Sequence, residues 1–301
     1  MVPHWSGVYT ALTTSFKEDG TVDLAAVESH IRRQLDAGVH GIVVLGSLGE
    51  NGTLSPPEKL DVIRAAASAC GARVPLLSGV AETTTTGACA FARSAAKLGV
   101  SGFMVLPPMQ YAADEREAER YLRDVAEVSD LPIMIYNNPV SYRVDVTPAM
   151  FARLADEPKF IAIKESSDNI RRITDIRNLV GDRYAIFTGV DDLIMESLLV
   201  GAVGWVAGLV CAFPKEAVAL YNLVRTRRID EALTLYQWFT PLLHLDVSVK
   251  FVQNIKLAEA LADGGNERVR PPRLPLAGEE RERVKQVIED ALKTRPRLPE
   301  I

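Results

Sequence analysis

Two residues able to take part in carbonyl chemistry end two consecutive apolar runs. Lys164 follows the run FIAI at residues 160–163, and Tyr136 follows PIMI at residues 132–135. An amine at the end of a buried strand loses hydration, which lowers its pKa and makes it nucleophilic near neutral pH. A phenol on the neighbouring strand could carry protons for imine chemistry. The alternative is a lysine that simply reaches solvent or pairs with Glu165.

Two further segments end apolar runs in the same way. The turn GSLGEN at residues 46–51 follows the run at 41–45, and its glycines would let backbone N–H groups approach a carboxylate. The segment TGVDD at residues 188–192 ends another run and carries Asp191 and Asp192. These two acids resemble a metal-binding pair, but no histidine accompanies them, which favours a helix N-cap and a first-turn acid. We assign none of the four histidines to catalysis.

The elements that would position these residues alternate regularly along the chain. Eight short apolar runs are each followed by a segment with helical apolar spacing, which predicts an α/β protein with a (β/α)8 barrel. The carboxyl ends of barrel strands share one mouth, so Lys164, Tyr136 and the turn at 46–51 should meet there. The predicted strands are 7–12, 41–45, 75–78, 102–106, 132–136, 160–164, 184–188 and 204–207.

Start and stop signals support these helices, and more helices follow the eighth strand. Asp23, Ser55 and Thr147 stand where N-caps are needed, and glycines such as Gly38 and Gly181 follow helix ends. Residues 230–263 and 279–294 have amphipathic helical spacing. We therefore predict a catalytic barrel at 1–228 and a C-terminal helical extension at 229–301.

Composition excludes several classes of function. Lys plus Arg number 34 and Asp plus Glu 39, so the net charge of −5 offers no positive field for nucleic acid. Three dispersed cysteines suggest neither a disulfide framework nor a zinc site, and they fit a reducing, cytoplasmic compartment. The N-terminus lacks the pattern of a secretory signal, and glycines interrupt the longest uncharged stretch, 197–214, which we interpret as a buried strand with its loops and not as a membrane span.

The motifs GSLGEN, YNNP, IAIKESS and TGVDD, in this order, resemble those of the dihydrodipicolinate synthase and N-acetylneuraminate lyase family of class I aldolases. The resemblance spans the whole chain and implies a homotetramer built from dimers, with no metal or cofactor, because a protonated lysine imine is itself the electron sink. By resemblance, the catalytic residues would be Lys164 as the imine-forming lysine and Tyr136 as the proton donor and acceptor, and the substrate-binding residues would be Ser47, Leu48, Gly189 and Val206.

Three positions depart from the pattern of true dihydrodipicolinate synthases. Leu48 stands where those enzymes have the second of two threonines, and it cannot pass a proton. The dipeptide Met-Gln at 109–110 replaces a tyrosine pair, with Tyr111 only beyond it. Ser141 replaces an arginine, and Arg143 lies two positions on. These differences argue against condensation of pyruvate with aspartate semialdehyde, because they remove proton-relay and carboxylate-binding groups.

The rest of the sequence, including MIYNNPVSYRVDVTP and WFTPLLHLD, looks most like the branch of the family that contains 1-pyrroline-4-hydroxy-2-carboxylate deaminase. The resemblance implies a small keto acid or cyclic imine carboxylate as the substrate, with dehydration and release of ammonia. The alternatives are a pyruvate-dependent aldolase, a 2-keto-3-deoxy sugar acid aldolase or dehydratase, and 4-hydroxy-tetrahydrodipicolinate synthase. Outside enzymes, a non-catalytic keto-acid sensor is possible on this fold, although retention of Lys164 and Tyr136 counts against it.

Overall fold

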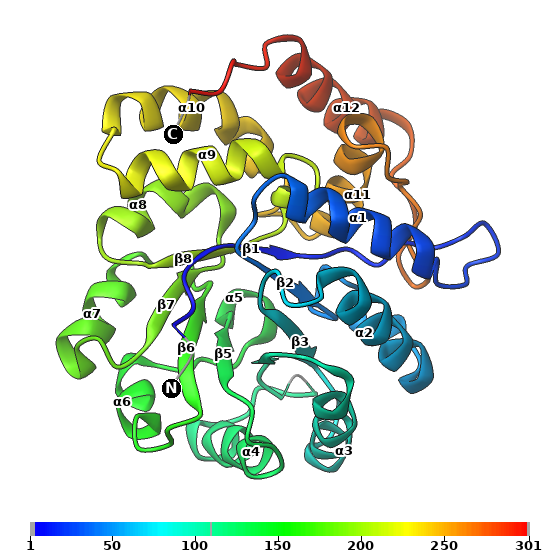
Figure 1. Cartoon of the computed structure of the whole chain (residues 1–301). Coiled ribbons are helices and arrows are strands. Elements are labelled where there is room, and N and C mark those ends of the chain that lie inside the picture. The colour runs from blue at the N-terminus through cyan, green and yellow to red at the C-terminus, as the bar shows by residue number, and fades with distance from the viewer. Residues whose placement is uncertain (1–3, 109, 300–301) are drawn as a thin grey trace.

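The computed structural model describes residues 4–108 and 110–299 as a closed barrel of eight parallel strands (Figure 1). Each strand pairs with its neighbours in chain order, and β8 pairs with β1 to close the barrel. The predicted (β/α)8 fold is confirmed. The strands are β1 Gly7–Ala11, β2 Gly41–Val44, β3 Leu76–Val80, β4 Gly102–Val105, β5 Ile133–Asn137, β6 Phe160–Glu165, β7 Ala185–Thr188 and β8 Gly204–Ala207.

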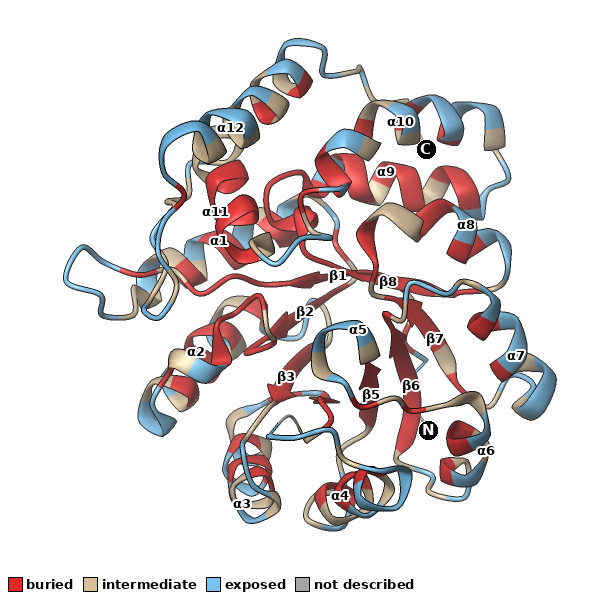
Figure 2. Ribbon diagram, turned by 180° about the vertical axis from the view of Figure 1, so that it is seen from behind, coloured by how far each residue is buried: buried red, intermediate tan, exposed pale blue. Residues whose placement is uncertain are grey.

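Helices surround the barrel and present their polar faces to solvent, while the strands are buried (Figure 2). The first nine are α1 Leu24–Asp36, α2 Pro56–Cys70, α3 Thr85–Ala95, α4 Glu115–Glu127, α5 Pro139–Tyr142, α6 Pro148–Leu154, α7 Arg171–Val180, α8 Ile194–Leu199 and α9 Pro214–Arg225. The C-terminal helices are α10 Ile229–Leu243, α11 Phe251–Ala262 and α12 Gly278–Lys293. The short helix α5 directly follows β5 and therefore lies at the carboxyl end of the strands.

The predicted helix starts are confirmed. Asp23 accepts a hydrogen bond from the backbone N–H of Ala26, and Thr147 accepts one from Met150. Ser55 forms a capping box with Glu58 at the start of α2. Such side chains supply partners for N–H groups that the helix itself leaves unpaired.

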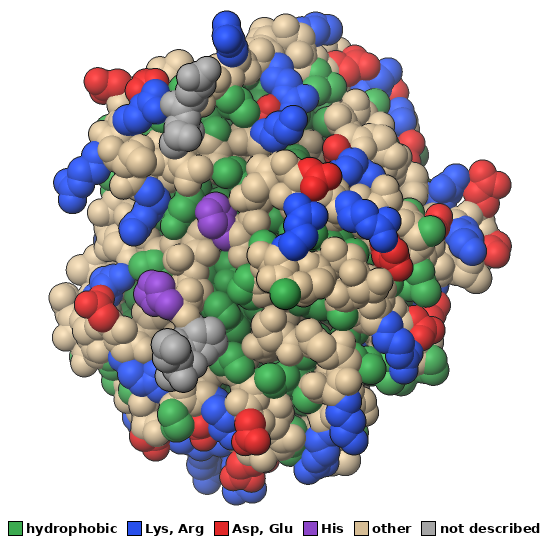
Figure 3. Space-filling model, in the orientation of Figure 1, with side chains coloured by type: hydrophobic (Ala, Val, Ile, Leu, Met, Phe, Trp, Pro, Cys, Tyr) green, Lys and Arg blue, Asp and Glu red, His purple; other side chains and the backbone are tan. Residues whose placement is uncertain are grey.

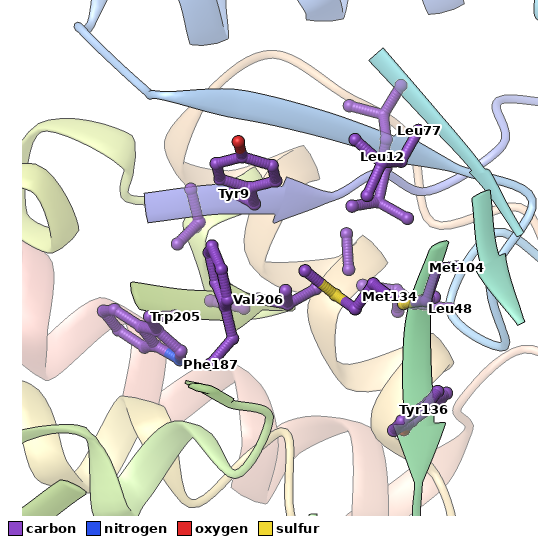
Figure 4. Packing of buried hydrophobic residues seen from close by; sticks show 14 of the residues in the cluster. Tyr9, Leu12, Leu48, Leu77, Met104, Met134, Tyr136, Phe187, Trp205 and Val206 are labelled. Atoms are coloured by element: carbon purple, nitrogen blue, oxygen red, sulfur yellow. The ribbon is translucent and has the colours of Figure 1, made fainter. Parts of the chain in front are cut away.

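Large side chains fill the barrel interior, as the inward layers of such a barrel require. The rings of Tyr9 and Phe187 meet edge to face, with their centroids 5.0 Å apart. Figure 4 shows Val206 beside Met134 in this interior, with Tyr136 set apart from them on its own strand. The lower barrel is thus a packed core, and only its upper layer is open to a ligand.

The C-terminal extension differs from the sequence-based prediction in one respect. Residues 230–263 are not one helical stretch, because the chain leaves α10 after Leu243 and starts α11 at Phe251. The intervening segment 244–250 reaches the carboxyl-terminal mouth of the barrel. The proposed boundary between residues 228 and 229 lies in the turn between α9 and α10.

A buried ion pair joins the extension to the mouth of the barrel. Lys256 on α11 donates to Glu50 at 2.6 Å and to the carbonyl of Thr14 at 2.8 Å. Arg270 donates to both carboxylate oxygens of Glu58 on α2. Because Glu50 belongs to the turn that contains Ser47, the extension holds this turn in place.

The surface carries charges of both signs. On the face shown in Figure 3, acidic and basic side chains lie interspersed around the rim, and apolar side chains gather near the centre. Within residues 4–108 and 110–299, none of the helices combines the length and the apolar character that crossing a bilayer would need.

Candidate active site

Lys164 and Tyr136 are direct neighbours on adjacent strands, as predicted. They are register partners in the β5–β6 pair, and their side chains are 7 % and 6 % exposed. The Lys164 amine nitrogen lies 4.3 Å from the centroid of the Tyr136 ring. Successive residues of a strand point to opposite faces, so Glu165 points away from Lys164. The alternative pairing of Lys164 with Glu165 is therefore wrong.

Glu165 has partners of its own on the outer side of the strand. Its carboxylate accepts hydrogen bonds from the Asn137 amide at 3.1 Å and from the Ser167 backbone N–H at 2.8 Å, and it lies 3.5 Å from the Arg172 guanidinium. These contacts fix the end of β6, which in turn fixes the direction of Lys164.

Burial lowers the pKa of the Lys164 amine, while the acidic groups of Asp246, Tyr142 and Asp191 oppose this shift. Among the described residues, no hydrogen-bond or ion-pair partner lies within reach of the amine. A lysine with a lowered pKa and no partner is the form that attacks a carbonyl or imine carbon.

Two phenols and a hydroxyl line up beside this amine. The hydroxyl of Tyr142, on α5, forms a hydrogen bond with the hydroxyl of Ser47 in the turn after β2. The rings of Tyr136 and Tyr142 meet edge to face with centroids 5.7 Å apart, and Asn138 donates to the Tyr136 oxygen at 3.2 Å. Burial raises the pKa of both phenols, so both carry their protons. Hydroxyl groups arranged in this way can pass a proton from one to the next.

Sequence reasoning missed Tyr142. It stands six residues after Tyr136 and directly after Ser141, the position at which the synthases have an arginine. The signal that could have found it is the preceding Asn-Pro pair: Asn138 caps α5 by accepting from the backbone N–H of Ser141, and Pro139 occupies its first turn. This single helical turn, α5, folds the chain back over the barrel mouth (Figure 2). It thereby brings the Tyr142 phenol to Ser47.

A cavity of about 510 Å³ opens over these side chains at the carboxyl ends of the strands. Of the predicted site residues, the structure places five along its wall: Lys164, Tyr136, Ser47, Leu48 and Gly189. Val206 is not among the described lining residues. It is 1 % exposed and belongs to the packed interior, so its predicted place at the wall is wrong, and Gly208 lines the cavity at the end of β8 instead.

Gly189 leaves room for the amine. A Cβ atom at this position would lie 2.4 Å from Cε of Lys164 and 2.1 Å from the hydroxyl oxygen of Ser166, which is closer than real Cβ contacts. The Ser166 hydroxyl also lines the cavity, is buried and has no hydrogen-bond partner. An unpaired buried hydroxyl is costly unless a ligand or water satisfies it.

Asp191 is not the helix N-cap that we predicted. Its buried carboxylate accepts from the Trp205 indole N–H at 2.9 Å, from the Leu209 N–H at 2.8 Å and from the Gly208 N–H at 3.2 Å. Asp191 is the first residue of the 3-10 turn Asp191–Leu193, with Val190 at the N-cap position, and its carboxylate crosses to the end of β8. Asp191 thus braces the cavity wall from below.

The positions that differ from the synthases are spread over two places. Ser141 lines the cavity, whereas Arg143 is exposed and is not among the described lining residues. Gln110 and the 59 % exposed Tyr111 line a separate hollow of about 560 Å³ near α3 and α4, whose described lining residues include no lysine that could form an imine. Met109 lies outside the described residues. Among the described residues, the arginine that lines the cavity is Arg273, from the segment after α11, and its guanidinium lies 3.8 Å from the Glu50 carboxylate.

One buried group of potential metal ligands lies elsewhere, between α1 and α11. His30, Cys211 and Glu259 have ligand atoms within 4.8 Å of one another. The Cys211 thiol donates to the Ala11 carbonyl, and burial raises its pKa well above the usual value. Glu259 accepts from Thr13 at 2.7 Å. These contacts describe a hydrogen-bonded core network, because a metal would need the thiolate that burial disfavours.

The barrel and the amine-bearing cavity at its mouth are those of an aldolase-type lyase. The sequence model of the dihydrodipicolinate synthetase family matches residues 4–291, and the chain belongs to this family. Over 287 residues the chain is 29 % identical to the 4-hydroxy-tetrahydrodipicolinate synthase of Methanothrix thermoacetophila, covering 94 % of this chain and 95 % of that protein.

Solved structures agree over nearly the whole chain. Dihydrodipicolinate synthase DapA-2 of Bacillus anthracis superposes with a TM-score of 0.92 at 26 % identity, covering 99 % of this chain and 100 % of that one. YagE of Escherichia coli K12, a family member crystallised in complex with pyruvate, superposes with a TM-score of 0.90 at 27 % identity, covering 96 % and 99 % of the two chains.

Proposed function

We propose that this enzyme forms an imine between Lys164 and a small 2-keto acid or cyclic imine carboxylate, and that its reaction is that of 1-pyrroline-4-hydroxy-2-carboxylate deaminase. The observation that carries the proposal is the unpartnered Lys164 amine, 4.3 Å from the centroid of the Tyr136 ring, in a cavity that also holds the Tyr142–Ser47 hydroxyl pair. Amine, phenol and hydroxyl are the groups that imine formation and proton transfer require.

In the proposed reaction the Lys164 amine adds to the ring carbon next to the carboxylate. The ring C–N bond then breaks, which leaves an open-chain lysine imine with a primary amine at the far end. Removal of a proton from the neighbouring carbon gives an enamine, whose electrons expel the 4-hydroxyl group as water. A shift of the double bond turns the terminal amine into an imine. Its hydrolysis releases ammonia, and hydrolysis of the lysine imine frees 2-oxoglutarate semialdehyde; one water is consumed overall.

The side chains around the amine have separate roles in this proposal. Tyr136 takes and returns the proton at the carbon beside the imine. Tyr142 and Ser47 connect Tyr136 to the substrate carboxylate. The turn at 46–51 offers backbone N–H groups to that carboxylate, and Arg273 supplies a positive charge at the same mouth. Because Tyr142 would complete the proton relay, the relay would not need the tyrosine pair that synthases have after β4.

The synthase reaction is the second candidate, because relatives such as the Methanothrix protein carry that name. Leu48 and Ser141 both line the cavity, at positions where synthases have polar or cationic groups. These replacements leave fewer partners for a second carboxylate, which favours a substrate with one carboxylate. By resemblance to the family we also propose a homotetramer in the cytoplasm. The net charge of −5 argues against a nucleic-acid partner.

The test is a substrate panel given to the purified enzyme. With 4-hydroxy-1-pyrroline-2-carboxylate we expect ammonia, measured by a coupled enzyme, and 2-oxoglutarate semialdehyde, identified by mass, without pyruvate. With pyruvate and aspartate semialdehyde we expect little or no condensation. Release of pyruvate from a 2-keto-3-deoxy sugar acid, with no ammonia from the pyrroline, would favour the aldolase. Rapid condensation would establish the synthase, and binding without turnover of any substrate would indicate a sensor.

A further inference from the structure

The segment between α10 and α11 brings a carboxyl group into the candidate active site. Asp246 lines the same cavity as Lys164 and Tyr136, although it lies 82 residues after Lys164 and outside the barrel. Its Oδ1 atom lies over Gly208 at the end of β8, so close that a Cβ atom on this glycine would meet it at 2.2 Å. The absence of a side chain at 208 makes room for the carboxyl group.

Asp246 and the phenols flank the amine from different sides of the mouth. Tyr136 lies on β5, next to Lys164 on β6, whereas Gly208 follows β8, two strands further round the closed barrel. Among the described residues, the Asp246 carboxyl group has no hydrogen-bond partner. A half-buried, unpartnered carboxyl group that faces a cavity is available to a ligand there.

The two carboxyl groups near Lys164 have different surroundings. Burial raises the pKa of Asp191 to about 6, but the hydrogen bonds that it accepts from three N–H groups oppose this shift and favour its ionised form. Asp246 has no such donors and lies near the charge of Asp191, and its removal from bulk water together with this charge raises its pKa well above the usual value. Where two neighbouring acids differ in this way, the one without donors is the one that keeps its proton.

We propose that Asp246 is a catalytic acid that protonates the departing hydroxyl group of the substrate. This inference rests on the proposed deaminase function. As the enamine electrons form the new C=C bond, the C–O bond breaks and the oxygen takes the Asp246 proton, so that water leaves instead of hydroxide. The carboxylate then accepts the proton that the terminal carbon loses when the double bond shifts, which restores the acid. Tyr136, on β5, handles the proton at the carbon next to the imine.

The proposal explains why the extension reaches the barrel mouth. Condensation or cleavage at the carbon next to a lysine imine needs one proton-transfer group beside that carbon. Loss of a hydroxyl group needs a second, because hydroxide is a poor leaving group at neutral pH. The interruption of the C-terminal helices at 244–250 supplies this second group.

The experiment compares Asp246→Asn with wild-type enzyme and with Asp290→Asn, an exposed aspartate on α12, as the matched control. With the 4-hydroxy pyrroline we expect ammonia release by Asp246→Asn to fall by roughly 100-fold or more, mainly in kcat. With the 4-chloro analogue, chloride leaves without a proton and before the double bond shifts, so the release of chloride by the same variant should stay within about 3-fold of wild type. Trapping of pyruvate on Lys164 with borohydride should proceed normally, which reports an intact fold and amine.

Each result bears on a different claim. An unchanged rate of ammonia release from the hydroxy substrate by Asp246→Asn would overturn the role of Asp246 as an acid, and so would a loss of chloride release from the chloro substrate as large as the loss of ammonia release from the hydroxy substrate. Loss of pyruvate trapping in this variant would also overturn it, because Asp246 would then support Lys164 and not the leaving group. Wild-type enzyme that releases no ammonia from the hydroxy substrate would instead refute the proposed function itself.

Discussion

Replacing Tyr142 with Phe removes the phenol that joins Tyr136 to Ser47. The ring would keep its edge-to-face contact with Tyr136 at 5.7 Å, so packing is preserved. A positioned proton-transfer group contributes roughly 10²–10⁴-fold to a rate. Tyr142 acts through Tyr136 and is half-buried, so water can partly take its place. We therefore expect a decrease in kcat at the lower end, about 100-fold, which corresponds to ~2.7 kcal/mol in the barrier.

Stability should change far less than activity in Tyr142→Phe. Ser47 loses one hydrogen-bond partner, which costs about 1 kcal/mol, and Tm should fall by no more than about 3 °C. The assay is steady-state release of ammonia from the hydroxy pyrroline, with Tm measured by calorimetry. The control is Tyr111→Phe, which removes an exposed phenol from the other hollow. A Tyr142→Phe rate within about 3-fold of wild type, or an equal loss in Tyr111→Phe, would refute a relay through Tyr142.

Three further predictions concern the amine, its neighbour and the buried ion pair. Tyr136→Phe should lower turnover by roughly 100-fold or more with little change in Tm; a wild-type rate would reduce this residue to packing. Burial lowers the pKa of Lys164, so its attacking neutral form should increase with pH around a midpoint below 10.5, and a rate of pyruvate imine formation that follows a midpoint at or above 10.5 would contradict this. Lys256→Met removes the nearer of two cations beside the buried Glu50, since the Arg273 guanidinium stays at 3.8 Å, and should cost about 3 kcal/mol, whereas the pair Lys256→Met with Glu50→Gln should recover part of that loss in urea unfolding.

The barrel was predictable because its signals are local. Hydrophobic runs bounded by Gly and Pro mark the strands, and caps such as Asp23 and Thr147 mark the helices, so most boundaries agree within one or two residues. The meeting of Lys164 with Tyr136 followed from topology alone, since both end strands that are adjacent in the barrel.

The rest of the site depends on contacts between residues far apart in the sequence. Tyr142 meets Ser47 across 95 positions because α5 turns back over the mouth, and no periodicity records that turn. Asp246 enters because the helical pattern of 230–263 breaks after Leu243, where spacing alone suggests continuation. Val206 is 1 % exposed and is not among the described residues that line the cavity, and the apolar run that contains it does not record how deep each residue lies.

The central claim is that Lys164 forms a covalent imine with its substrate, and borohydride trapping tests it most directly. The enzyme is incubated with saturating pyruvate or hydroxy pyrroline, reduced with borohydride, digested and analysed by mass. We expect an irreversible addition of the ligand's mass to the peptide that contains IAIKESS, located on Lys164, and no addition and no turnover in Lys164→Ala. An unmodified Lys164 under saturating ligand, or full activity in Lys164→Ala, would contradict the account.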